Sequence, residues 1–158
     1  MDKIDARILK SLQADSSGTI AQLAEQVGLS LSACHRRIKM LEKAGYITGY
    51  GASLSREALG LAVEVFVEIS LHSQSVASLS AFEKAVNNTD EILECHLTAG
   101  NADYLLRLAA RDIAQFEEIH RTRLAELPGV ASMRTTFALK AVKSWNGLPV
   151  PAAPHTPG

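Results

Sequence analysis

The sequence predicts an α+β protein made of two units, a helical one followed by one in which strands and helices alternate. Two observations support this prediction. In residues 1–50 apolar side chains recur at helical spacing, whereas from residue 62 onward several stretches alternate apolar and polar side chains, as half-buried strands do. At 158 residues, 47% of them hydrophobic, the chain is long enough for two small globular domains.

The first two helices are defined by the residues that cap and break them. Asp2 is placed to cap a first helix, and Asp5 supplies an acid in its first turn. The run of small residues that ends at Gly18 breaks this helix. Thr19 then caps a second helix, with Gln22 in the capping-box position. We therefore expect two short helices in close succession.

The third helix is expected to begin after Ser30, its N-cap, and to end at about Ala44, with Gly45 in the C′ role. A short turn separates it from the second helix, which is the arrangement of a helix-turn-helix. Residues 46–52 are rich in β-forming side chains, which suits a wing or a hinge strand, and residues 53–60 are expected to form a turn and one helical turn.

The second unit is expected to follow the order βαββαβ. Its elements are predicted at residues 62–71 (strand), 76–88 (helix), 92–98 (strand), 104–110 (strand), 112–127 (helix) and 130–139 (strand). This order is the ferredoxin-like plan, in which both helices cover one face of an antiparallel sheet. We expect the other face to be apolar, so that a second copy of the chain covers it. Trp145 is expected to pack as a lone anchor under the C-terminal segment.

Positive charge is concentrated on the third helix. The chain has a net charge of -1, but residues 30–44 hold four Lys or Arg and one Glu. Because Cys34, Ile38 and Leu41 share one stripe that must face the other helices, the basic side chains lie on the opposite face. A basic face on the last helix of such a unit predicts contact with double-stranded DNA. The residues expected to contact DNA are Ser30, Ser32, His35, Arg36, Arg37, Lys39 and Lys43.

These side chains are expected to have different roles. Ser32 lies near the helix N-terminus, where base edges are usually read, and Arg36 can donate two hydrogen bonds to a guanine. Lys39 and Lys43 suit phosphates. Arg37 lies at the border of the buried stripe, so we expect it to contact a phosphate or an acid of the first helix such as Asp5, rather than a base.

Residues 98–104 join two predicted strands and form a candidate ligand loop. Gly100 allows a positive φ and exposed backbone N–H groups, which can hold a carboxylate, and Asp103 can pair with an ammonium group. Together they would hold both ends of an α-amino acid. The alternative is a plain hairpin turn in which Asn101 and Asp103 stabilise the bend.

The motifs of both halves resemble those of the Lrp/AsnC, or feast/famine, family. The matching stretches are DARILKSLQAD, IAQLAEQVGLS, S-x-x-x-R-R-I-K-x-L-E, GYITGYGASL, ECHLTAGNADYLLRL and LPGVASMRTTFALKAVK. The resemblance implies a winged helix-turn-helix joined by a hinge strand to a βαββαβ (RAM) domain, in a transcriptional regulator. It also implies homodimers, often assembled into octamers, with a small amino acid bound between subunits.

The resemblance further implies which residues bind the effector and where the domains begin and end. The effector-binding residues are expected to be Leu97, Thr98, Gly100, Asn101, Asp103, Thr135 and Thr136, the last two supplied by a neighbouring chain. We expect a DNA-binding domain at 1–50, a hinge at 51–61, a ligand-binding and oligomerisation domain at 62–148 and a disordered, Pro-rich tail at 149–158.

The sequence offers little support for other classes of protein. Neighbouring side chains such as Cys34 and His35, or Cys95 and His96, diverge too much to chelate a metal, and neither a catalytic set nor a cofactor motif is visible. We expect no membrane segment or signal peptide, and hence a cytoplasmic protein. Two alternatives stay open: an architectural DNA-binding protein that responds to no effector, and a small enzyme of the kind that ferredoxin-like dimers also form.

Overall fold

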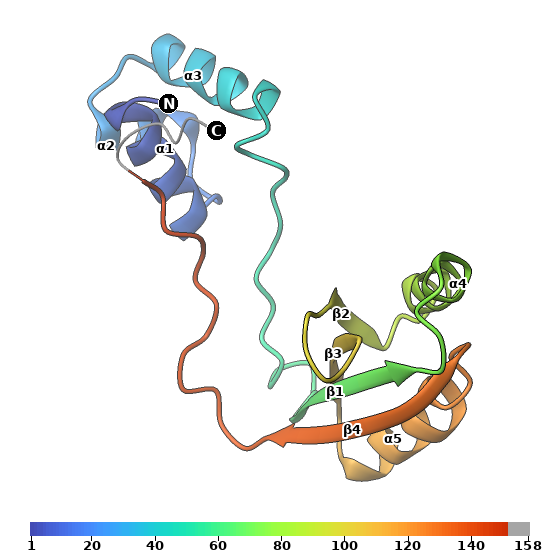
Figure 1. Ribbon diagram of the computed structural model, residues 1–158. Coiled ribbons are helices and arrows are strands. Elements are labelled where there is room, and N and C mark those ends of the chain that lie inside the picture. Colours follow the sequence, from blue (N-terminus) through green and yellow to red (C-terminus); the bar gives the residue numbers. More distant parts are fainter. Residues whose placement is uncertain (152–158) are drawn as a thin grey trace. The chain divides into compact units, whose positions relative to one another are not determined.

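The computed structural model describes residues 1–151 and divides into two compact units. The first comprises Met1–Ser53 together with the C-terminal segment that begins at Lys143, and the second comprises Leu54–Val142 (Figure 1). The division therefore places residues 143–148 with the helical unit, whereas the sequence suggested that they end the second domain. Of the expected disordered tail, residues 149–151 belong to the described chain and residues 152–158 lie outside it.

The first unit consists of the three predicted helices, α1 (Lys3–Ala14), α2 (Ile20–Val27) and α3 (Leu31–Lys43). The predicted N-caps are confirmed. The Asp2 carboxylate accepts hydrogen bonds from the backbone N–H groups of Ile4 and Asp5, both at 2.8 Å, and the Asp5 carboxylate accepts one from Asp2 N–H at 2.8 Å. Thr19 and Gln22 form the same reciprocal capping box at α2. These bonds satisfy N–H groups that have no partner inside the helix.

One apolar cluster holds the three helices together. It consists of Ile8, Leu23, Ala24, Val27, Cys34, Ile38 and Leu41, with Leu9, Leu12 and Ile47 packed against it. Cys34 is fully buried, and this burial raises the pKa of its thiol. It therefore acts as a small apolar side chain, as the helical spacing predicted.

The expected strand over residues 46–52 is not formed. Within residues 1–151 this segment is extended but carries no strand pairing. A strand needs the N–H and C=O groups of a neighbouring backbone, so β-forming side chains alone do not make one. The following turn is formed, since Leu59 N–H donates to Ser55 O at 3.1 Å and Leu61 N–H donates to Arg56 O at 2.8 Å.

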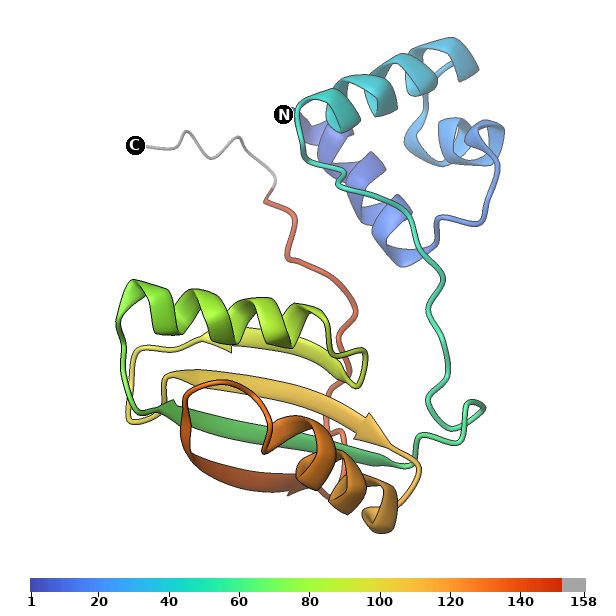
Figure 2. The ribbon, with the colours of Figure 1, turned by 90° about the vertical axis from the view of Figure 1, so that its right-hand side faces the viewer.

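The second unit has the predicted ferredoxin-like order. Its elements are β1 (Val63–Leu71), α4 (Val76–Asn87), β2 (Ile92–Leu97), β3 (Tyr104–Ala110), α5 (Ile113–Ile119), η1 (His120–Leu124) and β4 (Val130–Ala138). The sheet has the strand order β2-β3-β1-β4 and every neighbouring pair is antiparallel. Figure 2 shows α4 and α5 on the same face of this sheet. Beneath them, Val65, Val67 and Ile69 are fully buried.

The single helix expected over 112–127 is divided. Asp112 caps α5 as predicted, accepting from Gln115 N–H at 2.7 Å, but the helix then widens into the π-helical turn η1, where Ala125 N–H donates to His120 O. The spacing of apolar residues along one face does not distinguish an α-helix from a π-helix over a single turn.

The open face of the sheet is mixed in character, which corrects the expectation of an apolar face: Phe66 and Leu105 lie on it, in register with Arg107 and Glu68. Glu64 is only 8% exposed and its two carboxylate oxygens accept from Arg107 Nε and Arg56 Nη1, both at 2.7 Å. Burial alone would raise the pKa of Glu64, but its bonds to Arg107 and Arg56 outweigh burial, so this pKa is lowered. Arg107 also bonds Glu94 at 2.7 Å. Because strand side chains alternate, burying the valines of β1 directs its glutamates to this face.

Two further observations concern single features of the described chain. Trp145 is 78% exposed, so the expectation that it packs as an anchor is wrong. Its neighbours belong to an extended segment, and no apolar cluster lies there to receive the ring. No helix within residues 1–151 has the length and apolar character needed to span a bilayer.

Candidate functional site

Helix α3 presents one apolar and one polar face. Cys34, Ile38 and Leu41 are buried against α1 and α2, as their spacing predicts. The side chains expected to contact DNA lie on the remaining surface, where the following residues are exposed: Ser30, Ser32, His35, Arg36, Lys39 and Lys43. One chain therefore brings these six residues together on a single helix and its N-cap.

Arg37 is the exception among the residues expected to contact DNA. Its Nη1 atom lies 2.7 Å from Asp2 Oδ2 and 2.7 Å from Asp5 Oδ1. The hydrogen bond that Arg37 donates to Asp5, and then the one that it donates to Asp2, raise the pKa of Arg37. The sequence suggested such a contact with Asp5. Arg37 thus fixes α3 against the N-terminus of α1, where the two carboxylates also cap the helix.

The polar face of α3 contains its own hydrogen bonds. Ser30 Oγ accepts from Ala33 N–H at 3.3 Å and caps the helix. Lys39 Nζ donates to Glu42 Oε2 at 2.7 Å, and Glu42 Oε1 accepts from Tyr50 Oη–H at 3.0 Å. These bonds, with Lys39 contributing more than Tyr50, lower the pKa of Glu42. The Lys39 side chain is nevertheless 62% exposed and accessible to a polyanion.

This arrangement suits the major groove of DNA. An α-helix fits the groove, polar side chains near its N-terminus reach base edges, and basic side chains further along reach phosphates. Ser32 lies in the first turn of α3, Arg36 one turn later, and Lys43 in the last turn. The ion pairs of Arg37 with Asp2 and Asp5 hold α3 against α1, and Arg36 stays exposed.

The loop between β2 and β3 is closed by its own hydrogen bonds. Thr98 N–H donates to Asp103 O at 2.8 Å and Thr98 Oγ1 donates to Ala102 O at 2.6 Å. Asp103 connects this loop to the end of β1, because its Oδ2 accepts from Leu71 N–H and its Oδ1 from Gln74 Nε2, both at 2.7 Å. Each carboxylate oxygen thus has one hydrogen bond and retains further acceptor capacity.

The expected backbone conformation of Gly100 is not found. Within residues 1–151 positive φ values occur at five glycines, and Gly100 is not among them. The loop closes through Thr98 and Asp103 without a left-handed residue, so the anion-binding nest that depended on this conformation has no support. Asn101, also predicted here, lies exposed in the same loop.

The remaining effector candidates lie elsewhere on the sheet. Leu97 ends β2, one edge strand, whereas Thr135 and Thr136 lie on β4, the opposite edge. Thr135 is paired with Val67 and Thr136 with Phe66, so the two threonines point to opposite faces of the sheet. The loop is hydrogen-bonded to β1 through Asp103, and the threonines lie on β4, the strand that pairs with β1.

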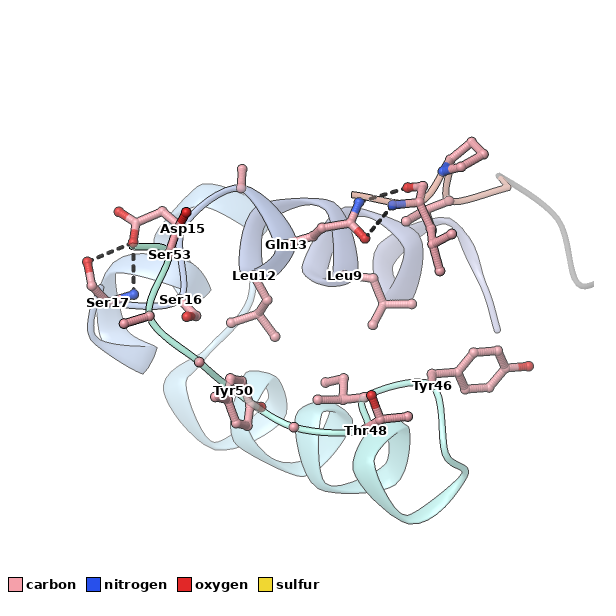
Figure 3. Close-up of a pocket in the computed structure, with 18 of the residues that line it drawn as sticks. Leu9, Leu12, Gln13, Asp15, Ser16, Ser17, Tyr46, Thr48, Tyr50 and Ser53 are labelled. Carbon is pink, nitrogen blue, oxygen red and sulfur yellow. Dashed lines mark hydrogen bonds between the residues drawn. The ribbon is translucent and has the colours of Figure 1, made fainter. Parts of the chain in front are cut away.

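A cavity that the sequence did not indicate lies in the helical unit. It has a volume of about 650 Å³ and is lined by α1, residues 46–53 and residues 148–151 (Figure 3). Its apolar side includes Leu9, Leu12 and Ile47. The segments that form it are far apart in the sequence, so no local pattern could have revealed it.

Metal ligands do not gather in the described part of the chain. Within residues 1–151 no group of three His, Cys, Asp or Glu side chains is placed to hold a metal ion.

Comparisons with known proteins match both units. Residues 64–148 match the model of the Lrp/AsnC ligand binding domain, and residues 1–48 match a winged helix-turn-helix DNA-binding model. The chain is 39% identical to the Bkd operon transcriptional regulator of Pseudomonas aeruginosa, over 90% of this chain and 93% of that one. It is 38% identical to the leucine-responsive regulatory protein of Escherichia coli, over 94% and 90% of the two chains.

A solved structure shares the whole fold. The transcriptional regulator of Neisseria meningitidis in complex with L-methionine superposes with a TM-score of 0.90 at 34% identity, over 94% of this chain and 96% of that chain.

Proposed function

This chain belongs to the Lrp/AsnC family of transcriptional regulators, and from that premise we propose that it reads specific DNA sequences with α3 and that a small amino acid, bound between two copies of the chain, changes this reading. At the coarser level the assignment is established by its relatives: it is a DNA-binding transcriptional regulator with an amino-acid ligand-binding domain, and not an enzyme. The DNA sequence specificity, the amino-acid effector and the residues that bind each of them are what we propose.

The observation that carries the DNA-reading half is the exposed face of α3. Ser32 and Arg36 are exposed, while Arg37 is held by Asp2 and Asp5. Arg36 is proposed to read a base, because a guanidinium can donate two hydrogen bonds to one guanine. Lys39, Lys43, Ser30 and His35 are proposed to contact the sugar-phosphate backbone, which positions the helix but carries little sequence information.

The effector half is supported by the loop that contains Asp103. Its carboxylate retains acceptor capacity for an ammonium group, and the solved relative from Neisseria meningitidis is described as a complex with L-methionine. Thr98, Leu97, Gly100 and Asn101 are proposed to line the same site.

We propose that Thr135 and Thr136 reach the effector from a second copy of the chain. They lie on β4, an edge strand of the sheet, where a neighbouring chain can present them beside Asp103. An effector held in this way stabilises one assembly of chains over another by its differential affinity, and so alters the arrangement of the paired α3 helices.

The experiment begins with selection of a binding sequence from random DNA duplexes by the purified chain. Affinity for the selected duplex is then compared with that for a shuffled duplex of the same composition, at a fixed salt concentration because phosphate contacts are strongly salt-dependent. We expect at least a thousandfold preference. Equal affinity for the two duplexes would contradict sequence-specific reading and favour an architectural DNA-binding protein.

The effector half is tested separately by measuring the thermal stability of the chain with each of the twenty amino acids. A ligand that binds only the folded state raises the melting temperature. The amino acid that does so should also change the affinity for the selected duplex. If none of the twenty changes either quantity, the proposed amino-acid effector is wrong, whatever the outcome with DNA.

A further inference from the structure

The C-terminal segment of the chain is hydrogen-bonded to helix α1. Gln13 Nε2 donates to Leu148 O at 2.7 Å, and Leu148 N–H donates to Gln13 Oε1 at 2.9 Å. Figure 3 shows both bonds as dashed lines beside the labelled Gln13. The side-chain amide of Gln13 thus pairs with both backbone groups of one residue, as a residue of a neighbouring antiparallel strand would.

The residues around Leu148 favour this pairing. Pro149 and Pro151 restrict the backbone to the extended region and have no N–H group of their own, so Leu148 supplies the donor. Gly147 has a φ of 108°, a conformation that side-chain-bearing residues rarely adopt. A Cβ atom at this position would collide with Cγ, Cδ and Nε2 of Gln13. Only glycine therefore permits the Gln13 side chain to lie against the segment.

The bonds lie at the rim of the cavity in the helical unit. Leu148, Pro149, Val150 and Pro151 line it together with α1 and residues 46–53. Leu9 and Leu12 are partly buried and pack on the core of the three helices, so the floor of the cavity is a fixed surface. The segment 148–151 therefore forms one wall of this cavity, and apolar side chains of α1 form another.

We propose that residues 146–151 form a clasp that fastens this segment to α1. Residues 139–145 connect this clasp directly to β4, which ends at Ala138. The helical unit is then joined to the sheet at two places, through the residues that follow α3 and through the clasp. Because Asp2 and Asp5 of α1 also hold Arg37 of α3, the clasp links the strand that carries Thr135 and Thr136 to the DNA-reading helix.

The chain contains a probe for this clasp, because Trp145 is its only tryptophan and is 78% exposed. Time-resolved fluorescence anisotropy of Trp145 reports whether residues 143–148 are fastened, and amide hydrogen exchange of Leu148 reports its bond to Gln13 directly. Two variants remove the clasp in different ways: Gln13→Ala removes both bonds, and Gly147→Val adds a side chain where none fits. Gln26→Ala is the matched control, since it removes an exposed glutamine of the same unit.

We expect Trp145 to move more freely in Gln13→Ala and in Gly147→Val than in the unaltered chain or in Gln26→Ala. The Leu148 amide should exchange about tenfold faster in both clasp variants. The melting temperature should change little, since Gln13 is exposed. If Trp145 is already as free in the unaltered chain as in Gly147→Val, or if Gln13→Ala leaves the Leu148 exchange rate unchanged, the clasp is overturned. Neither measurement uses DNA or an amino acid, so the outcome is independent of the proposed function.

Discussion

The DNA-reading face and the candidate effector site are built in opposite ways. The exposed side chains from Ser32 to Lys43 lie on one helix, and that helix is capped, buried and braced by contacts within the first 44 residues. The effector candidates lie on a loop at one edge of the sheet and on β4 at the other. The proposed DNA-reading site lies on one helix of a single chain, whereas the proposed effector site draws on separate strands and, in our proposal, on a second chain. The predictions below test this contrast.

The largest expected effect concerns the independence of the two cores. Phe82 is fully buried and its ring centroid lies 4.5 Å from that of Tyr104. Phe82→Ala should lower the free energy of unfolding of the sheet unit by about 3–5 kcal/mol, because it removes apolar contacts and leaves a cavity. Amide hydrogen exchange should show faster exchange in β1 and β3, with α1 to α3 unchanged. Equal acceleration in both units would mean that the DNA-reading face is not self-sufficient.

The next effect is a loss of stability in alkali that is confined to the sheet unit. Burial, and then the hydrogen bond that Tyr104 Oη–H donates to Glu83 at 2.9 Å, raise the pKa of Tyr104 to about 12. The unfolded chain loses this proton near pH 10, so stability is complete below pH 10 and falls as the pH rises toward 12. The loss should reach roughly 2–3 kcal/mol.

This alkaline effect has a matched control in Tyr104→Phe, which keeps the ring and removes the hydroxyl group. Circular dichroism across the pH range should show the loss in the unaltered chain and a smaller loss in the variant. The same pH dependence in both proteins would assign it to other groups.

A third prediction concerns the DNA-reading face alone. Arg36→Ala should weaken binding to the selected duplex by about 1–3 kcal/mol while the melting temperature stays the same. Arg111→Ala removes an equal charge from an exposed position of the sheet unit and serves as the control. If the two variants lose the same affinity, only net charge matters and Arg36 does not read a base.

The smallest expected effect concerns the coupling between the two sites. Asp103→Asn should abolish the change in DNA affinity caused by the amino acid, a coupling on the order of 1 kcal/mol, while the free protein still binds DNA. Gln74→Ala removes a hydrogen bond to Asp103 but leaves its charge. A response lost equally in both variants would give Asp103 a positioning role, and a response kept in both would place the effector elsewhere.

The helical unit could be predicted almost completely from the sequence, because its signals are local. The capping boxes at Asp2 and Thr19 each join residues three positions apart, and the apolar stripe of α3 lies within one helix. The strand order of the sheet also followed from the order of the elements. Polar alternation in β1 was visible, but the arginines that pair with Glu64 come from other segments.

What the sequence did not predict depends on distant partners or on small differences in backbone form. Gln13 and Leu148 are 135 residues apart, and the Gln13 side chain bonds the backbone groups of Leu148, which have no signature in the residue type. The π-helical turn at His120–Leu124 differs from an α-helix by one residue in its hydrogen bonding. A positive φ was expected at Gly100 because glycine can adopt one. Glycine adopts negative φ values equally well, so the residue type alone does not determine φ.

The ion pair of Arg56 limits how far the connection between the units can extend. Arg56 bonds Glu64 of β1 at 2.7 Å and closes a turn on Leu61, so the far end of the connection is attached to the sheet. Only residues 46–55, ten residues, are left between Gly45 and this attachment. Fully stretched, they measure roughly 33–36 Å, about the length of one turn of B-DNA. This contour length is therefore the greatest separation that the connection allows between Gly45 and Arg56.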